Sequence, residues 1–294
     1  MSVRITKLQD QVLSAKAASL QYLHQLGLPT PPTIIVPGYR PGDVFPLEDL
    51  GQTANFYVRF CFRKEARRRD KWQVVRAEEI ESILVEFASD SHIGDAIIQP
   101  FLLTIRSGAV LKQSGVALVE VAQGLAPTLL RHGRFYYRAV VRDLTTVCDE
   151  TVDQDITVTL GESGIAPHKV TGKTSNDADT LTSRVVALIT SLQHILLEWG
   201  TIGDDIVFFD HKEIPIRSGF FELSDHPPRI PRSVTTTVTA ITTSSSKRIL
   251  QLEYPDLENL ARARESDFVL VKHGALLSHL SVYSFNEPYK CAFQ

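Results

Sequence analysis

The stretch LSAKAASLQYLHQLGLPTPPTIIVP, residues 13–37, joins a helical pattern to a strand pattern through a short connection. Apolar residues recur near helical spacing, which predicts an amphipathic helix over residues 5–27. Gly27 suits the left-handed conformation common at helix C-termini, and the prolines that follow prevent the helix from continuing. The β-branched segment TIIVP, residues 33–37, then predicts a short strand.

Similar signals along the chain predict a mixed fold of the α+β or α/β class. A helix is expected at residues 76–89, and the clearest long helix at residues 179–200. A hairpin-like pair is expected around His132 and Gly133, and a turn is possible at His211 and Lys212. The remaining strands are predicted at residues 56–62, 95–102, 114–124, 155–160 and 204–216.

Composition limits the classes of function. The chain has 294 residues, 43% of them hydrophobic, and a net charge of −3, so one or two domains are expected and nothing indicates a nucleic-acid or membrane partner. The basic run RKEARRRDK, residues 63–71, is more typical of a solvated face than of an anion site. The three cysteines lack CxxC spacing, which argues against a disulfide framework or zinc site. With no apolar leader at the N-terminus, a cytoplasmic location is expected.

A change of composition predicts the domain boundary. Residues 227–248 are rich in Pro, Ser and Thr, which favours a linker over an exposed strand. The expected organisation is a first domain at 1–227, a linker at 228–248 and a small αβ domain at 249–294. The triplet GKT at 172–174 lacks the glycine five residues earlier that a P-loop needs, because Pro167 stands there.

Two segments of the opening stretch resemble the ATP-binding domain of the phosphoenolpyruvate synthase and pyruvate phosphate dikinase family. That family begins with a GGKAANL-like segment that runs into GLPVPPGF. AKAASL at residues 15–20 and GLPTPP at residues 27–32 stand at the matching places. The resemblance implies an ATP-grasp nucleotide-binding domain.

Further matches follow in the family's order. YVR at 57–59 resembles the AVRSS strand, and AIIQ at 96–99 resembles the VIVQ strand. SGVA at 114–117 is similar to SGVAF, and the segment from Val119 to Leu125 resembles IEAxxGLGE. The last two matches lie further along the chain. LEW at 197–199 with IVFF at 206–209 is similar to DIEW…LYILQARP, and GALLSHLSVYSFNEP at 274–288 resembles GGxTSHAAIxARExGIP, the phosphohistidine signature of the family's swivelling domain.

The resemblance implies ATP and Mg²⁺ as cofactors, and it assigns nucleotide-binding roles to four residues of this chain. Lys16 and Arg59 would contact the ATP phosphates, Lys as a point charge and Arg as a bidentate fork. Gln99 and Glu120 would lie near the adenine and ribose. Taken alone, Lys16 is more typical of a surface helix lysine than of a phosphate ligand.

The resemblance also implies a metal site and a phosphoryl carrier. Glu198 would be a magnesium ligand, and Asp210 is the best candidate for a second, although it also suits a surface turn. His279 would carry the phosphoryl group, with Ser278 as the helix N-cap and Gly274 allowing a close approach of the backbone. The acceptor would be a small molecule or a partner protein.

The sequence departs from the family in several places. Residues 60–71 replace the family's glycine-rich loop over the phosphates, and residues 210–213 replace the QARP ending. Leu196 stands where the family has an aspartate, and no C-terminal barrel follows the short last domain. Three hypotheses follow: a histidine-relay phosphotransferase, an ATP-grasp kinase or ligase that acts directly on its substrate, and a non-catalytic nucleotide-binding or regulatory subunit.

Overall fold

The computed structural model describes residues 5–7, 14–37, 46–51, 53–63, 70–88, 90, 92–161, 164–170, 177–213, 248–283 and 289–293. These residues form two compact units. The first comprises residues up to 103 together with 207–211, and the second comprises residues 104–206 and 212 onwards. The structure therefore has mixed α and β content in both units, as expected.

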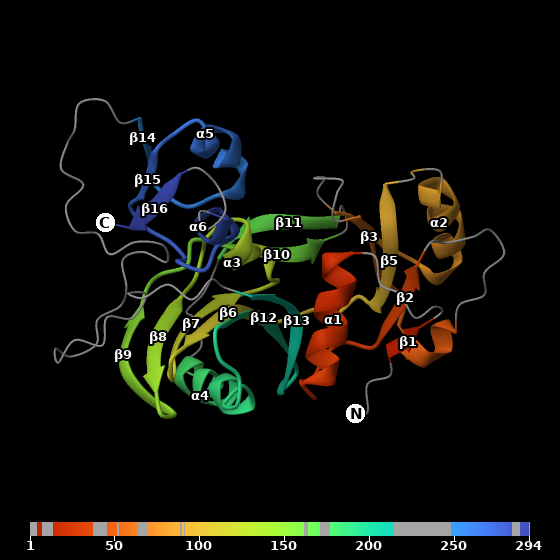
Figure 1. Cartoon of the computed structure of the whole chain (residues 1–294), viewed down its shortest axis with the longest axis horizontal. Helices are drawn as coiled ribbons and strands as arrows, with labels where there is room; N and C mark the ends of the chain where they lie inside the picture. Colours follow the sequence, from red (N-terminus) through yellow and green to blue (C-terminus); the bar gives the residue numbers. More distant parts are fainter. Residues whose placement is uncertain are drawn as a thin grey trace. The chain divides into compact units, whose positions relative to one another are not determined.

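The first unit is built on a five-stranded sheet in the order β1-β2-β5-β3-β4, in which only β1 and β2 are parallel (Figure 1). Its strands are β1 (Ile5–Lys7), β2 (Thr33–Pro37), β3 (Phe56–Phe62), β4 (Lys71–Val75) and β5 (Ile93–Pro100). Its helical elements are α1 (Ala15–Gln25), the 3₁₀ turns η1 (Leu47–Leu50) and η3 (Ala77–Glu79), and α2 (Ile80–Ala88).

Alternation along the strands gives this sheet two different faces. Phe56, Val58 and Phe60 of β3 point into an apolar cluster with Ile80 and Leu84 at α2. The intervening residues of β3 point to the opposite face, which α1 covers. The apolar contacts on that face are made by Ala17, Leu20, Ile35, Cys61 and Ile97.

The second unit contains a six-stranded sheet in the order β13-β12-β6-β7-β8-β9. Its strands are β6 (Arg106–Gln113), β7 (Val116–Gln123), β8 (Tyr137–Arg142), β9 (Thr145–Thr151), β12 (Ile195–Ile202) and β13 (Asp205–Glu213), of which residues 207–211 group with the first unit. β10 (Ile156–Gly161) and β11 (Gly164–Lys169) form a separate hairpin. A parallel three-stranded sheet contains β14 (Ile249–Leu252), β15 (Phe268–Val271) and β16 (Lys290–Phe293).

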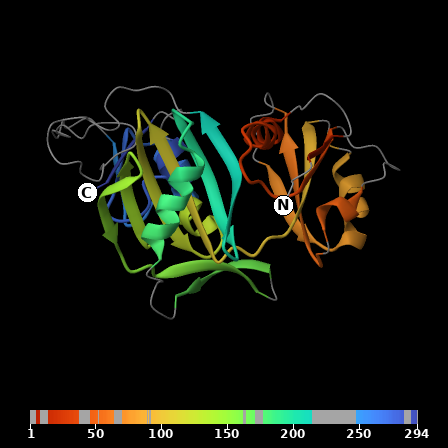
Figure 2. The ribbon, with the colours of Figure 1, turned by 90° about the horizontal axis from the view of Figure 1, so that it is seen from below.

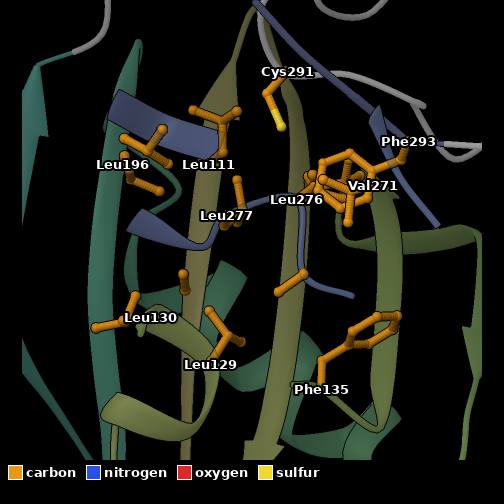
Figure 3. Close-up of a cluster of buried hydrophobic side chains, with 14 of the residues drawn as sticks. Leu111, Leu129, Leu130, Phe135, Leu196, Val271, Leu276, Leu277, Cys291 and Phe293 are labelled. Atoms are coloured by element: carbon orange, nitrogen blue, oxygen red, sulfur yellow. The ribbon is translucent and has the colours of Figure 1, made fainter. Parts of the chain in front are cut away.

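The helices of the second unit cover both faces of the six-stranded sheet. They are α3 (Pro127–Leu130), α4 (Ala178–Leu188), η4 (Leu257–Asn259), α5 (Leu260–Arg264) and α6 (His279–Tyr283). α4 lies on one face, and the C-terminal elements lie on the other (Figures 1 and 2). Leu276 and Leu277 enter the same buried cluster as Leu111 and Leu196 of the sheet (Figure 3). The described residues of 248–283 and 289–293 thus share a core with the sheet.

Several predictions of secondary structure are confirmed. Five strands and one helix are present within a few residues of their expected bounds. The strands are those expected at 33–37, 56–62, 95–102, 114–124 and 155–160, and the helix is the one expected at 76–89. None of the described helices is long and apolar enough to cross a membrane.

The long helix expected at 179–200 is wrong. α4 ends at Leu188, and residues 195–202 form strand β12 instead. The Nζ of Lys112 donates to the carbonyl of Ile189 at 2.9 Å and also to that of Thr190, so it satisfies groups at the helix end, and His194 turns the chain with a φ of 53°. Glu198 consequently lies on a strand.

Three other expectations need correction. The first helix begins at Ala15, after a three-residue strand at residues 5–7, and not at residue 5. β13 continues through His211 and Lys212 without a turn. The segment around His132 and Gly133 follows the short helix α3, whereas the hairpin joins β8 to β9.

Other expectations fall on residues that the structure does not describe. These include the GKT triplet and most of the basic run and of the Pro/Ser/Thr-rich segment. The expected domain boundaries at 227 and 248 lie in or beside that last segment, so they stay a prediction.

Candidate functional site

α1 is fixed at its start by two side-chain contacts. Ser14 is the N-cap, and its hydroxyl accepts a hydrogen bond from the backbone N–H of Ala17 at 3.2 Å. The backbone N–H of Ser14 in turn donates to Oδ2 of the fully buried Asp95 at 2.6 Å. These contacts hold the first turn of α1, which carries Lys16, against strand β5.

Lys16 meets residues that lie far away in sequence. Its Nζ lies 2.8 Å from Oδ2 of Asp210 and donates to the carbonyl oxygen of Phe209 at 2.9 Å, across a separation of 193 residues. The hydroxyl of Ser19, one turn along α1, donates to the other Asp210 oxygen at 2.6 Å. The Lys16 and Asp210 side chains keep 12% and 15% of their surfaces exposed. This pair is desolvated but still reachable from solvent.

Arg59 lies on the same α1-covered face, two residues from Tyr57 on β3. Its Nε and one terminal nitrogen donate to the Tyr57 hydroxyl at 3.1 and 2.8 Å, and the other terminal nitrogen is 3.8 Å from Asp70. Burial lowers the pKa of Arg59, but Tyr57, Cys61 and Asp210 together outweigh it and leave the pKa raised. Arg59 is therefore a permanent cation.

Gln99 completes the polar part of this face. It pairs with Tyr57 across β3 and β5, and its amide nitrogen donates to the hydroxyl of Thr33 at 2.9 Å. Four predicted residues therefore lie in the first unit. Lys16, Arg59, Gln99 and Asp210 occupy the α1-covered face of the sheet or contact α1 there, and this group is called the polar face below.

The second unit carries a row of charged residues across its sheet. Register pairing joins Glu198 to Ala109, Ala109 to Glu120, Glu120 to Arg138, and Arg138 to Glu150. Directly paired residues share one face of an antiparallel sheet, so all five lie on the face that the C-terminal segment covers. These residues are called the charged row below.

The centre of the charged row is a buried ion pair. Oε1 of Glu120 lies 2.6 Å from a terminal nitrogen of Arg138 and accepts a hydrogen bond from its Nε at 2.7 Å. The two Glu120 oxygens also accept the backbone N–H groups of Leu276 and Leu277, each at 2.8 Å. Glu120 is fully buried. This carboxylate thus fixes the C-terminal loop, an arrangement that offers no exposed oxygen to the predicted ribose.

The loop at 274–279 runs along the charged row. The carbonyl of Gly274 accepts a hydrogen bond from Arg138 at 2.7 Å, and His279 reaches Glu198. Gly274 has a φ of 116°, and a Cβ there would lie 2.5 Å from Pro255 and 2.7 Å from the Gly133 carbonyl oxygen. The predicted close approach at Gly274 therefore involves the protein's own chain.

The end of the row brings two predicted residues together. Nε2 of His279 lies 3.3 Å from Oε1 of Glu198, and Nζ of Lys212 lies 3.0 Å from the same oxygen. The His279 side chain is 20% exposed. A carboxylate between an imidazole and an ammonium can orient the ring and hold a proton on Nε2.

Sequence reasoning missed Arg138, Lys212 and Glu150. Lys212 was interpreted as a turn residue, and Arg138 lay in a predicted hairpin with no assigned role. A register prediction would have found Arg138 opposite Glu120, because a buried carboxylate requires a cation or several donors.

Metal binding would have to use few protein ligands. In the described part of the chain, no group of three or more His, Cys, Asp and Glu side chains lies close enough to hold a metal ion. Mg²⁺ usually takes one or two carboxylates together with waters and phosphate oxygens, so Glu198 and Asp210 are chemically suitable donors. They belong to different units, and each is paired with a lysine.

Comparison with known proteins gives distant structural likenesses. No family model matches the chain, and no curated protein matches it. The D-alanine–D-alanine ligase from Bacillus anthracis complexed with ATP is 10% identical, with a TM-score of 0.38 over 69% of this chain and 56% of that one. The ATP-grasp ligase PsnB complexed with a minimal precursor is 14% identical, with a TM-score of 0.33 over 70% and 54%.

A third structure, the L-amino acid ligase from Bacillus licheniformis, is 10% identical, with a TM-score of 0.33 over 68% of this chain and 40% of that one. The chain thus spans about half the length of the first two structures, 56% and 54%. None of the three is a phosphoenolpyruvate synthase or a pyruvate phosphate dikinase. Identities and TM-scores this low do not establish a shared fold or activity.

Proposed function

We propose that the chain is an ATP- and Mg²⁺-dependent enzyme of the ATP-grasp type that transfers a phosphoryl group directly to a bound acceptor, as a kinase or ligase does. The observation that carries the proposal is the ion pair of Lys16 with Asp210 on the polar face, where the carboxylate of Asp210 also contributes to the raised pKa of Arg59. These residues match the resemblance to an ATP-binding domain, and they converge from opposite parts of the sequence.

The chemistry of the polar face suits a triphosphate. Phosphoryl transfer mainly requires positioning and neutralisation of charge on the phosphate oxygens. Lys16 would bind as a compact cation when Asp210 turns to a metal, and Arg59 would bind through the two-pronged guanidinium that Tyr57 orients. Bound magnesium, held by Asp210, would supply the remaining positive charge.

The packing of the C-terminal segment favours direct transfer over a histidine relay. A relay needs residues 249–294 to travel, but Leu276 and Leu277 are buried in a cluster with the sheet. Departure of the loop would also strip Glu120 of two backbone donors. Exposing apolar surface and leaving a buried carboxylate short of partners both cost free energy.

The relay remains the second candidate because of one contact. His279 is partly exposed and lies beside Glu198, a predicted metal ligand. An imidazole in that position is available as a nucleophile near neutral pH. The two candidates differ in the effect of substituting His279: direct transfer predicts that turnover continues, and a relay predicts that turnover stops.

Titration calorimetry with magnesium and a non-hydrolysable ATP analogue tests the proposal. We expect the wild-type chain to bind and Lys16→Ala to weaken binding by about 10- to 100-fold, the value of a charged hydrogen bond. His24→Ala, an exposed substitution on the same helix, is the matched control and should bind like the wild type.

Three outcomes would contradict the proposal. The first is no binding to the wild type, and the second is equal binding by Lys16→Ala. The third is tight binding with no ATP consumed in the presence of acceptors such as amino acids, amines and carboxylic acids, which would favour the non-catalytic subunit.

A further inference from the structure

The second unit contains a cavity of about 510 Å³ that none of the predicted site residues except Gly274 lines. Two of its lining residues, Gly133 and Gly274, both pack against Pro255. Both glycines have positive φ, 64° and 116°, and a Cβ at either position would lie within 2.5 Å of the proline ring. Two close approaches of the backbone therefore shape this cavity.

The walls combine aromatic rings with charged groups. Phe135, Tyr254 and Phe293 supply apolar surface. Arg134 lies over the ring of Tyr254, with Cζ 3.4 Å from the ring centroid, and Arg138 lies over Phe135 at 4.1 Å. Each arginine thus covers one aromatic ring and is held in place by it.

The cations of the cavity are already paired with carboxylates. Arg134 lies 3.0 Å from Asp155 and 3.3 Å from Asp256. Lys272 lies 3.3 Å from Glu253. Arg138 pairs with Glu120 and Glu150 of the charged row.

The charged residues that line the cavity are balanced in number. The lining has three permanent cations, Arg134, Arg138 and Lys272, and three carboxylates, Glu150, Asp153 and Asp155. Asp153 is exposed and has no hydrogen-bond or ion-pair partner among the described residues. The three cations are each paired with a carboxylate, so one lining carboxylate, that of Asp153, is available to a cationic ligand.

We propose that this cavity binds a small organic cation, a primary ammonium group attached to an aromatic or aliphatic body. The body would lie against the aromatic wall, and the ammonium group would meet Asp153 at the rim, with Glu150 nearby on β9. Apolar walls with a few charged groups are typical of small-molecule sites. The inference does not depend on the proposed function, because no residue of the polar face takes part.

Calorimetry without nucleotide tests the inference with two probes of the same skeleton and opposite charge, phenethylamine and 3-phenylpropionate. We expect one phenethylamine to bind per chain with a Kd of about 1 mM or tighter, and 3-phenylpropionate to bind at least about 10-fold more weakly. Binding of the amine should weaken as salt is added. Equal binding of the two probes, or tighter binding of the acid, would overturn the assignment.

Two substitutions place the binding in the cavity. Asp153→Asn removes the available charge without a change of shape and should weaken phenethylamine binding about 5- to 10-fold, the value of a partly exposed charge contact. Val152→Trp should fill the cavity and abolish binding. Asp149→Asn is the matched control, because Asp149 is an exposed carboxylate that pairs with Ala139, on the other face of the sheet from Glu150. Equal affinities for the wild type and both Asp153→Asn and Val152→Trp would overturn the proposal.

Discussion

The polar face of the first unit and the charged row of the second use the same residue types in opposite ways. The Lys16–Asp210 pair keeps 12% and 15% of its side chains exposed, and its other partners include a hydroxyl, a backbone carbonyl and a backbone N–H. The Glu120–Arg138 pair keeps 0% and 8%, and it binds the backbone of the C-terminal loop. We expect the first pair to exchange partners with a ligand, whereas the second cannot do so without loosening the fold.

This difference shows that burial and partners, more than residue type, decide what a charged pair does. The family resemblance assigns Lys16 and Glu120 to the same nucleotide site. The structure gives Glu120 four donors from the protein itself, which occupy its carboxylate in the folded state. A carboxylate whose oxygens are occupied in this way is not available to a ligand.

The largest expected effect is on the buried pair. Arg138→Leu leaves the carboxylate of Glu120 buried without its cation and should lower the free energy of unfolding by about 3–5 kcal/mol. Lys16→Ala, the equivalent change in the less buried pair, should cost less, about 1–2 kcal/mol, because Asp210 keeps the donors of Ser19 and of the His211 backbone. Urea denaturation followed by circular dichroism measures both.

If the two variants lost the same free energy of unfolding, the charged row would not be more important for stability than the polar face, and this prediction would be wrong. If Arg138→Leu does not yield folded protein, Glu120→Gln provides the second measurement. It keeps the shape of the side chain and should still destabilise clearly more than Glu150→Gln at the exposed end of the row.

The next effect concerns the glycine that lets the loop lie along the charged row. Gly274→Ala should lower the free energy of unfolding by about 2–4 kcal/mol, from its positive φ and from the clash with Pro255 and Gly133. Gly203→Ala is the control, because Gly203 also has a positive φ, 58°, but no atom within 4 Å of a Cβ. It should cost about 1 kcal/mol. A similar loss for the two variants would show that the loop adapts and does not press on its neighbours.

Much of the fold follows from local sequence signals. Segments such as FYVRFCF alternate clearly, and Gly27 with its following prolines ends α1 as expected. The prediction of one helix over residues 179–200 failed for a physical reason. ALITSLQHILLEW is apolar enough to extend either a helix or a strand, and the break depends on Lys112, a residue distant in sequence, together with the φ of His194.

The site was predictable only in part for the same reason. Ordered motifs pointed to Lys16, Asp210, Glu198 and His279, and the structure brings the first two together and the last two together. What the motifs omit is strand register. Whether Glu120 faces a ligand or Arg138 depends on how β7 and β8 pair, and that pairing is set by tertiary packing.

A smaller effect compares one buried thiol from each region. Burial raises the pKa of Cys61, and burial raises that of Cys291 to about 12 despite a hydrogen bond with Ser281. An unfolded thiol loses its proton near pH 9, whereas both folded thiols keep theirs, so the unfolded state binds fewer protons above this pH. The stability that the buried thiols contribute is complete below pH 9 and declines as the pH rises toward the folded pKa values.

The slope of this decline can be measured thiol by thiol. Each thiol should contribute up to about 1.4 kcal/mol per pH unit to the fall in the free energy of unfolding. Urea denaturation at pH 8, 9 and 10 should therefore give a shallower decline for Cys61→Ala and for Cys291→Ala than for the wild type. A slope unchanged by Cys291→Ala would mean that this thiol is accessible in the folded protein, and that the core shared by the C-terminal segment and the sheet opens.

The smallest expected effect separates the two candidate mechanisms. If transfer is direct, His279 assists through Glu198, and His279→Ala should leave ATP-dependent activity within a few-fold of the wild type, a change under about 1 kcal/mol. Lys16→Ala in the same assay should lose on the order of 10²–10³ in kcat, because an oriented charge on the phosphates is lost. A relay predicts instead that His279→Ala abolishes turnover, because this substitution removes the phosphoryl carrier. It also predicts acid-labile label on the wild type, but not on His279→Ala, after incubation with β- or γ-labelled ATP. Label of that kind would show that the C-terminal segment leaves the sheet during turnover. The contacts of Glu120 and Arg138 with the loop at 274–279 would then break and re-form in every cycle.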